Sequence, residues 1–244
     1  MNFDELPEGC IAKAISLTTP ADACRLSVVS PGFRSAADSD TVWNEFLPSD
    51  YASTVSRSHG PSNLMSLPSK KQLFFSLCND PILIDGGSKS FWLDKWSGKK
   101  CYMIAARDLM IAWGGTPTYW SWINLPDSRF DEVAELRYVW WLEIRGKIDT
   151  SQLSPATTYT AFLVFKIGDE ATDLGVYPTE VSAGVVGGTM SKSNVCLDPR
   201  FGDASEARRR LPRPWYAPRV NNRVSGLKCP TRRNDGWFEI ELGE

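Results

Sequence analysis

The sequence predicts an α+β protein, in which a small all-helical bundle precedes an antiparallel β-sandwich. Two patterns along the chain support this fold class. In the first 48 residues, apolar side chains recur at helical spacing between helix-capping signals. From about residue 88 they alternate with polar side chains, as in strands that are buried on one face. With 244 residues, the chain is long enough to bury a sizeable core.

The first helices are indicated by their starting residues. Leu6-Pro7 opens a segment in which Ile11 and Ile15 lie one helical turn apart. Thr19 can then cap a second helix, with Pro20 at its first position. We expect this helix to end before the next proline in the chain.

Two further short helices complete the predicted bundle. Ser30-Pro31 repeats the pattern of a capping residue followed by proline. Asp40 can cap a last helix that carries Trp43 and Phe46, and Leu47-Pro48 ends it. A bundle of this size has a small core, so we expect some of its apolar side chains to stay uncovered and to dock against a partner.

The segment LPEGCIAKAISLTTPADACRLSVVSPGFRSAADSDTVWNEFLP resembles the F-box of plant F-box proteins over more than forty residues. This resemblance implies docking to the Skp-type adaptor of a cullin-RING ubiquitin ligase. It also implies that the LP pair and the spaced apolar residues face the adaptor. These residues are Leu6, Pro7, Ile11, Leu26 and Val29. Trp43 can belong either to the bundle core or to the adaptor contact.

Residues 49–87 are expected to be a linker and a joining helix. Residues 49–66 are polar and contain the single histidine, His59, which is typical of an exposed linker. Leu73, Phe74 and Leu77 have the spacing of an amphipathic helix. Residues 82–87 then form a short extended stretch that ends in a Gly-Gly turn.

Strands are predicted by alternating apolar residues over residues 109–113, 136–144, 159–167 and 238–242. Clusters of Pro, Gly, Asp and Ser separate them, which favours an antiparallel sandwich spanning residues 88–244. Within the second of these strands, Trp140 is expected in the core.

Residues 191–235 show little alternation and are interpreted as a long insertion between strands. They contain the arginine runs Arg208-Arg209-Arg210 and Arg232-Arg233. These arginines can contact a phosphate or an acidic partner, or they can form a solvated loop face.

The run YMIAARDLMIAWGGTPTYWSW, residues 102–122, sets large aromatic rings around a Gly-Gly-Thr-Pro turn. Such rings fill sandwich cores, and they can also stack on the apolar face of a sugar. The run resembles the opening segment of the Nictaba-related plant phloem lectins. That resemblance implies a glycan-binding sandwich with Trp113 and Trp120 as the sugar contacts. Trp120 and Trp122 share a strand parity, and of the two we expect Trp120 to face the ligand and Trp122 to lie in the core.

One feature departs from the phloem-lectin pattern. Family members usually continue with further strands after the motif DGWFEIELGE, whereas this sequence stops at Glu244. We therefore expect a sandwich that is shortened at its C-terminus, with an open strand edge.

The composition limits the kinds of partner that we expect. The net charge is −2 and charged residues make up 23% of the chain, so no strong attraction to nucleic acid or to an anionic membrane is expected. No apolar run approaches the ~20 residues that span a bilayer. The N-terminus lacks the pattern of a secretory signal.

The cysteines indicate a reducing compartment. They form no CxxC pair, and we expect reduced thiols in a cytoplasmic or nuclear protein. The sequence contains no Asn-x-Ser/Thr acceptor site, which agrees with that location. The six cysteines are Cys10, Cys24, Cys78, Cys101, Cys196 and Cys229.

No catalytic arrangement stands out in the sequence. The single histidine lies in the predicted linker, and neither zinc-ligand spacing nor a phosphate-binding glycine loop is present. We therefore expect no catalytic residues, no metal and no cofactor. The prediction is a non-catalytic substrate receptor of a ubiquitin ligase that binds a glycan or glycoprotein. The alternative is an F-box receptor whose sandwich binds protein targets and no sugar.

Overall fold

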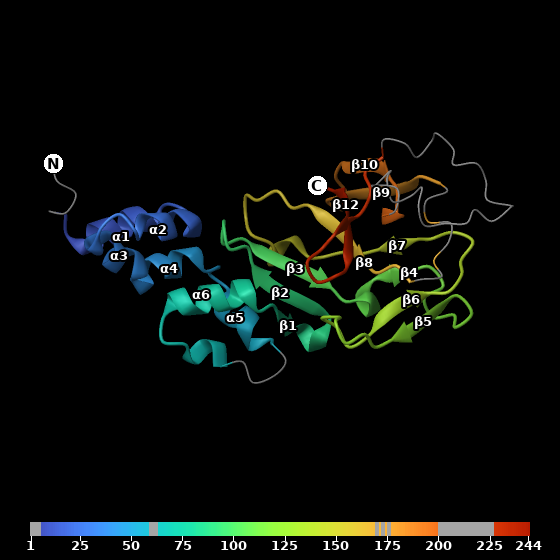
Figure 1. Ribbon diagram of the computed structural model, residues 1–244, viewed down its shortest axis with the longest axis horizontal. Coiled ribbons are helices and arrows are strands. Elements are labelled where there is room, and N and C mark those ends of the chain that lie inside the picture. Colours follow the sequence, from blue (N-terminus) through green and yellow to red (C-terminus); the bar gives the residue numbers. More distant parts are fainter. Residues whose placement is uncertain (1–5, 59–62, 169–170, 172–173, 175–176, 200–226) are drawn as a thin grey trace. The chain divides into compact units, whose positions relative to one another are not determined.

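The computed structural model describes residues 6–58, 63–168, 171, 174, 177–199 and 227–244. By its internal contacts the chain divides into two compact units, Met1–Ala156 and Thr157–Glu244. The expected α+β class is confirmed, because N-terminal helices are followed by antiparallel strands in small sheets (Figure 1). His59 and the run Arg208-Arg209-Arg210 lie outside the described residues.

Four short helices form the N-terminal bundle. They are α1 (Glu8–Ser16), α2 (Pro20–Leu26), α3 (Pro31–Asp38) and α4 (Asp40–Phe46). The predicted caps of α2 and α3 are confirmed: the side chains of Thr19 and Ser30 accept hydrogen bonds from backbone N–H groups in the first helical turn. The predicted cap of α4 is wrong by one position, because Ser39 caps this helix. The Asp40 carboxylate instead accepts from the backbone N–H of Lys70 at 2.7 Å.

The predicted linker contains a helix that the sequence did not reveal. Helix α5 (Tyr51–Ser56) has Thr54 and Val55 buried, at 1% and 3% exposure. A helix of six residues is too short to show a hydrophobic period, so its composition looked like that of a loop. After the 3-10 turn η2 (Asn63–Ser66), the expected joining helix is confirmed as α6 (Lys70–Asn79).

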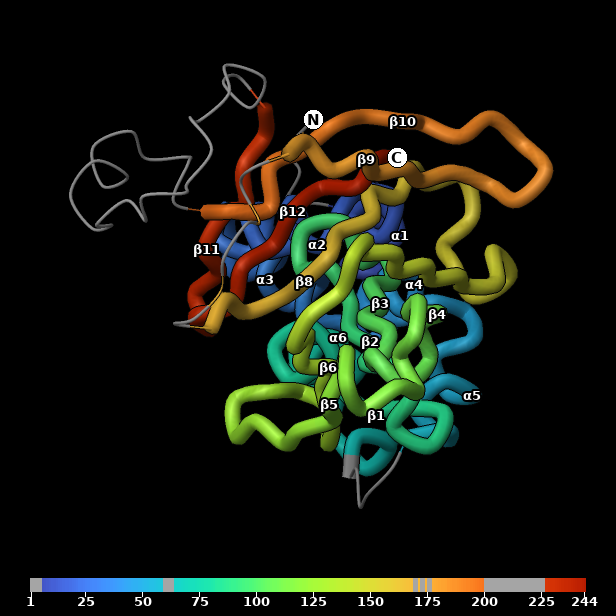
Figure 2. The backbone as a smooth tube through the Cα atoms, turned by 90° about the vertical axis from the view of Figure 1, so that its right-hand side faces the viewer, coloured from blue at the N-terminus to red at the C-terminus, as the bar shows by residue number. Residues whose placement is uncertain are grey.

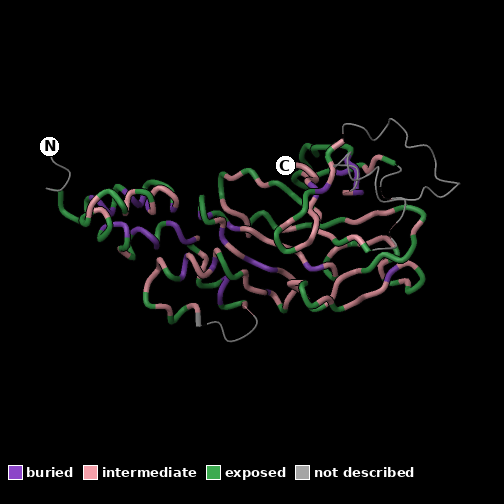
Figure 3. Tube along the Cα trace, in the orientation of Figure 1, coloured by how far each residue is buried: buried purple, intermediate pink, exposed green. Residues whose placement is uncertain are grey.

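Trp43 lies at the centre of the N-terminal core. Its ring is fully buried, its indole N–H donates to the carbonyl of Ala37 at 2.6 Å, and its centroid lies 5.2 Å from those of Phe74 and Phe75 on α6. The same hydrophobic cluster continues to Phe91 on the first sheet. The helical bundle and this sheet therefore share one core, and the buried stretches run through both (Figure 3).

The first sheet has the order β1-β2-β3, and every neighbouring pair is antiparallel. Its strands are β1 (Ile82–Ile84), β2 (Lys89–Leu93) and β3 (Lys100–Ile104). The predicted Gly-Gly turn after β1 is the 3-10 turn η3 (Asp85–Gly87), in which both glycines have positive φ.

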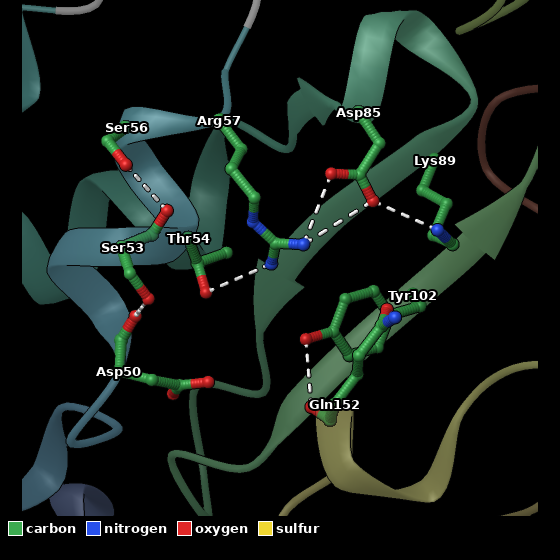
Figure 4. Close-up of polar contacts among 9 residues, drawn as sticks. All are labelled: Asp50, Ser53, Thr54, Ser56, Arg57, Asp85, Lys89, Tyr102 and Gln152. Atoms are coloured by element: carbon green, nitrogen blue, oxygen red, sulfur yellow. Dashed lines mark hydrogen bonds and ion pairs between the residues drawn. The ribbon is translucent and has the colours of Figure 1, made fainter.

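Polar contacts tie α5 to this sheet (Figure 4). The Asp85 carboxylate accepts from Arg57 at 3.1 Å and from Lys89 at 2.9 Å. Ahead of the same helix, Asp50 forms an ion pair at 2.7 Å with the buried Lys100 of β3. These contacts hold both ends of α5 against the first sheet.

Two further two-stranded sheets complete the first unit, with the pairs β4-β7 and β5-β6. Their strands are β4 (Met110–Ile111), β5 (Trp120–Ile123), β6 (Val133–Leu136) and β7 (Ile144–Arg145). The 3-10 turns η4 (Ala106–Asp108) and η5 (Thr150–Gln152) precede β4 and follow β7.

The single strand predicted over residues 136–144 is wrong, because residues 137–143 form no strand. Trp140 is 82% exposed, so its expected place in the core is wrong as well. The alternation in this segment arises from aromatic residues that lie on the surface. Periodicity cannot distinguish them from core residues of the same type.

The second unit holds the remaining strands, which pair as β9-β10 and β11-β12-β8. They are β8 (Ala161–Phe165), β9 (Thr179–Gly184), β10 (Met190–Val195), β11 (Thr231–Arg232) and β12 (Phe238–Gly243). Strands β9 and β10 form a long antiparallel hairpin (Figure 2). The predicted C-terminal strand is confirmed, with Ile240 buried and paired with Leu163. At Phe238 and Glu239 this strand has a neighbour on each side.

Candidate functional site: an exposed aromatic cluster

Two tryptophans of β5 hold the turn that follows β4. The indole N–H of Trp120 donates to the carbonyl of Ala112, and that of Trp122 donates to the carbonyl of Gly114, both at 3.1 Å. Because these tryptophans are two residues apart on a strand, both project to the face on which the turn lies. Trp120 is 5% exposed. Its expected orientation toward a ligand is therefore wrong, since parity cannot tell that the turn covers this face.

Trp113 lies between Ala112 and Gly114, whose carbonyls accept the hydrogen bonds from β5. Its backbone φ is 56°, in the left-handed region that non-glycine residues rarely adopt. Its carbonyl accepts from the N–H of Thr116 at 2.8 Å, which closes the turn. The ring leaves the alternation of the preceding strand and is 41% exposed. Strained backbone of this kind clusters at functional sites.

Two other rings pack beside Trp113. The centroid of Tyr119 lies 5.6 Å away and that of Trp141 lies 5.4 Å away, with ring planes tilted by 50° and 43°. Trp141 is 61% exposed. We call Trp113, Tyr119 and Trp141 the aromatic cluster. Residues from the turn and from the segment between β6 and β7 meet here, which explains why sequence spacing missed Trp141.

A second aromatic pair follows on the same segment. Tyr138 and Trp140 are 53% and 82% exposed, and their rings pack edge-to-face at 5.6 Å. Aromatic side chains that stay in water are uncommon unless they serve binding, because burying them is strongly favourable. The exposed rings therefore mark the segment between β6 and β7 as a candidate recognition surface.

Polar groups lie on the same hairpin. The backbone N–H of Arg137 donates to the carbonyl of Tyr119 at 2.9 Å. The Arg137 guanidinium donates to Ser121 Oγ at 3.1 Å, and that hydroxyl donates to the Glu135 carboxylate at 2.5 Å. Ser121 and Glu135 are paired directly across β5 and β6, so their side chains project to the face opposite to Trp120 and Trp122. Glu135 and Arg137 are exposed and can hydrogen-bond to solvent there.

Trp122 has a different role from the cluster. The Arg107 guanidinium lies 3.7 Å from its ring centroid, and Arg107 pairs with Glu132 at 2.8 Å. The arginine of the ARDL motif thus covers this ring. Trp122 is half-buried under it, which agrees in part with its expected place in the core.

The helical bundle leaves apolar side chains exposed, as expected. Not every residue that was predicted to contact the adaptor is among them. Leu6 and Val29 are 37% and 63% exposed, Pro7 is exposed, and Leu26 is half-buried against the core. Ile11 is only 6% exposed. Its predicted contact with an adaptor is therefore corrected, because its side chain faces the core of its own bundle.

Two exposed apolar residues of the bundle were not predicted. Leu17 is 76% exposed and Val28 is 75% exposed. Leu17 follows the last residue of α1, and Val28 lies two residues beyond the end of α2. Such positions lie beyond the ends of the helices, so helical spacing does not identify them. They become apparent only when the last residue of each helix is known.

The described residues offer no metal site, since no group of three or more His, Cys, Asp or Glu side chains is found among them. Burial raises the pKa of the Cys78 thiol to about 12 and that of Cys101 to about 11, so both stay protonated at neutral pH. None of the helices in the described ranges is long and apolar enough to cross a bilayer.

Two protein-family models match separate parts of the chain. The model of the F-box domain matches residues 3–45, and the model of phloem protein 2 matches residues 99–244. The domain combination is that of an F-box protein with a substrate-recognition role. The chain belongs to the F-box proteins that carry a phloem protein 2 domain.

Similar proteins from Arabidopsis thaliana have the same combination in their names. F-box protein PP2-B10 is 46% identical over 242 residues, which cover 99% of this chain and 80% of the relative. Putative F-box protein PP2-B12 is 46% identical over 246 residues, covering 100% and 84%. Putative F-box protein PP2-B2 is 44% identical over 243 residues, covering 99% and 72%. The expected family is confirmed, and its F-box domain implies binding to a Skp-type adaptor.

Proposed function

We propose that this protein is the substrate-recognition subunit of an SCF-type ubiquitin ligase. Its F-box docks to the Skp-type adaptor, and through it to the cullin-RING ligase. Its aromatic cluster binds a glycan or the glycan of a glycoprotein. The protein itself is non-catalytic, because ubiquitin transfer takes place on other subunits. The observation that carries the glycan part is the exposed Trp113 ring, set on a strained turn between Tyr119 and Trp141.

The aromatic cluster has the chemistry that sugar rings require. The C–H face of a pyranose packs on an aromatic ring, while its hydroxyls need hydrogen-bonding groups at the edge. Here Trp113 and Trp141 offer the rings, and the hydroxyl of Tyr119 in the same cluster can donate or accept a hydrogen bond. We therefore assign the sugar contact to Trp113, whereas Trp120 holds the turn through its hydrogen bond to the Ala112 carbonyl. A single site of this kind binds with about −4 to −8 kcal/mol, or millimolar to micromolar affinity.

Adaptor docking rests on the exposed apolar side chains of the bundle. Each such side chain stabilises a complex by up to about 1.5–3 kcal/mol when it becomes fully buried. The residues that we assign to this contact are Leu6, Pro7, Leu17, Leu26, Val28 and Val29.

This role belongs in the cytoplasm or nucleus. All six cysteines of the chain are free thiols, which supports a reducing compartment.

Glycan binding is tested with the full chain bound to its adaptor on a glycan array. Trp113→Ala should reduce the signal of the best glycan at least tenfold, equal to about 1.4 kcal/mol of binding free energy. Trp96→Ala is the matched control, because Trp96 is 59% exposed outside the aromatic cluster. A loss of equal size in both variants would contradict the assignment.

Adaptor docking is tested by a pull-down with the purified adaptor. The double substitution Leu17→Asp and Val29→Asp should abolish capture, because a charge cannot be buried in an apolar contact without a large desolvation cost. Met65→Asp is the control, since Met65 is 55% exposed and lies in η2, outside the bundle. Capture of the double variant at the level of the control would exclude these residues from the contact.

A second candidate function is recognition of a protein target without sugar. Tyr138 and Trp140 favour it, because large exposed aromatics are typical of protein interfaces. A glycan array without signal from a folded chain, together with a protein target whose capture depends on Trp140, would establish this alternative.

A further inference from the structure

Cys196 and Cys229 are brought side by side in the second unit. Val195, the last residue of β10, is bridged to Lys228 in parallel orientation, and the N–H of Cys196 donates to the carbonyl of Lys228 at 2.9 Å. The two cysteines are the next residue of each segment. In a parallel pair, residues in register point to the same side, about 4.7–4.9 Å apart. That separation lies within the Cα range of about 4.4–6.8 Å found in disulfides.

The two thiols differ in their exposure to solvent. Cys196 is fully buried, whereas Cys229 is half-buried and can meet a small reagent. Burial raises the pKa of the Cys196 thiol to about 11, and the neighbouring side chain of Cys229 adds to the rise. In the reduced state the thiols donate to carbonyls of their own segments, Cys196 to Asp198 at 3.6 Å and Cys229 to Leu227 at 3.8 Å.

We propose that Cys196 and Cys229 form a redox-sensitive thiol pair, which a small disulfide of the glutathione class converts into an intramolecular disulfide. The Cys229 thiol loses its proton to solvent and attacks the small disulfide, releasing one thiolate, which takes up a proton. Cys196 then loses its proton and attacks the mixed disulfide, releasing the second small thiol. Two cysteines are oxidised and one small disulfide is reduced to two thiols.

The bond would join positions that are far apart in sequence. It closes a stretch of 34 residues, counting both cysteines. Closing a loop of this length lowers the conformational entropy of the unfolded chain and so stabilises the folded second unit. Transient disulfides in reducing compartments are typically sensors rather than structural bonds. The inference is independent of glycan binding, because the aromatic cluster lies in the other unit.

The experiment incubates the full chain in glutathione buffers of increasing oxidised fraction, blocks free thiols by alkylation, and maps digested peptides by mass spectrometry. We expect one cross-linked peptide that joins Cys196 to Cys229, lighter by two hydrogen atoms and fully reversed by dithiothreitol. Cys229→Ser should abolish it. Cys24→Ser is the matched control, because Cys24 is another half-buried thiol, and it should leave the cross-link unchanged.

A second readout separates the bond from general oxidation. The urea-unfolding midpoint of the oxidised chain should exceed that of the reduced chain, and this increase should vanish in Cys196→Ala. Complete alkylation of both cysteines in the most oxidising buffer would overturn the proposal. A cross-link between Cys78 and Cys101 in place of Cys196–Cys229 would overturn it as well.

Discussion

At the scale of single residues, Trp113 combines an unfavourable backbone with an exposed ring. Its φ of 56° places the Cβ close to backbone atoms, at a cost of about 1–2 kcal/mol. Three groups hold it there: the indoles of Trp120 and Trp122, which bind the flanking carbonyls, and the hydrogen bond from Thr116. A conformation that costs stability and exposes a large ring is best explained by the function of the ring.

Two substitutions at this position separate strain from contact. Trp113→Gly and Trp113→Ala both remove the ring, and both should weaken glycan binding at least tenfold. Only glycine relieves the backbone, so Trp113→Gly should be the more stable variant by about 1 kcal/mol. Urea denaturation measures the difference. Equal stability of the two variants would show that the left-handed backbone is not strained.

Arg107 offers a test of the contact with Trp122. Arg107→Lys keeps the charge but loses the planar group that stacks on the ring and pairs with Glu132. Because Arg107 and Glu132 are half exposed, we expect a loss of only about 0.5–1 kcal/mol in unfolding free energy. Glu132→Gln should cost less than Arg107→Lys if stacking dominates. The reverse order would assign the larger part to the ion pair.

At the scale of elements, a helix boundary could be predicted when the residues that determine it are adjacent in sequence. Helix α2 has its cap and first proline adjacent in sequence, so Thr19 could be assigned from sequence alone. At α4 the neighbouring Ser39 and Asp40 both suit a cap, and only the contact of Asp40 with α6 decides between them. The strand predicted over residues 136–144 was wrong because its exposed aromatic side chains give the same composition as a core strand.

The contact between α4 and α6 can be tested at Asp40. Its carboxylate accepts from the backbone N–H of Lys70 at 2.7 Å. Asp40→Asn keeps an oxygen acceptor, whereas Asp40→Ala leaves this N–H without its partner. We expect Asp40→Ala to lower the unfolding free energy by about 1 kcal/mol, and Asp40→Asn to lower it by less. Thermal or urea unfolding resolves the two, and equal losses would show that the hydrogen bond contributes nothing.

At the scale of the whole molecule, the F-box helices are continuous with the first sheet. Trp43 packs on α6, and the same cluster extends to Phe91 of β2. This continuity was not predicted, because a polar segment around α5 looked like a spacer. Sequence patterns correctly indicated the N-terminal helices and the C-terminal strand. The core that connects the bundle to the sheet depends on contacts between distant segments, which local patterns do not contain.

A shared core predicts cooperative loss of structure. Trp43→Ala removes a fully buried ring and should cost about 3–5 kcal/mol. In hydrogen exchange, backbone amides of α1 and of β2 should lose protection together. Phe162→Ala is the control, since this ring is 49% exposed in the second unit and should leave both elements protected. Loss of protection in α1 with full protection in β2 would mean that the two fold separately.

The assignment of the aromatic cluster as the recognition site is tested most directly by the affinity of Trp141→Ala for the best array glycan. Titration calorimetry on the adaptor-bound chain should show at least about tenfold weaker binding. Trp140→Ala, which removes the adjacent and more exposed ring, should change the affinity by less than about twofold. Wild-type affinity in Trp141→Ala would contradict the account.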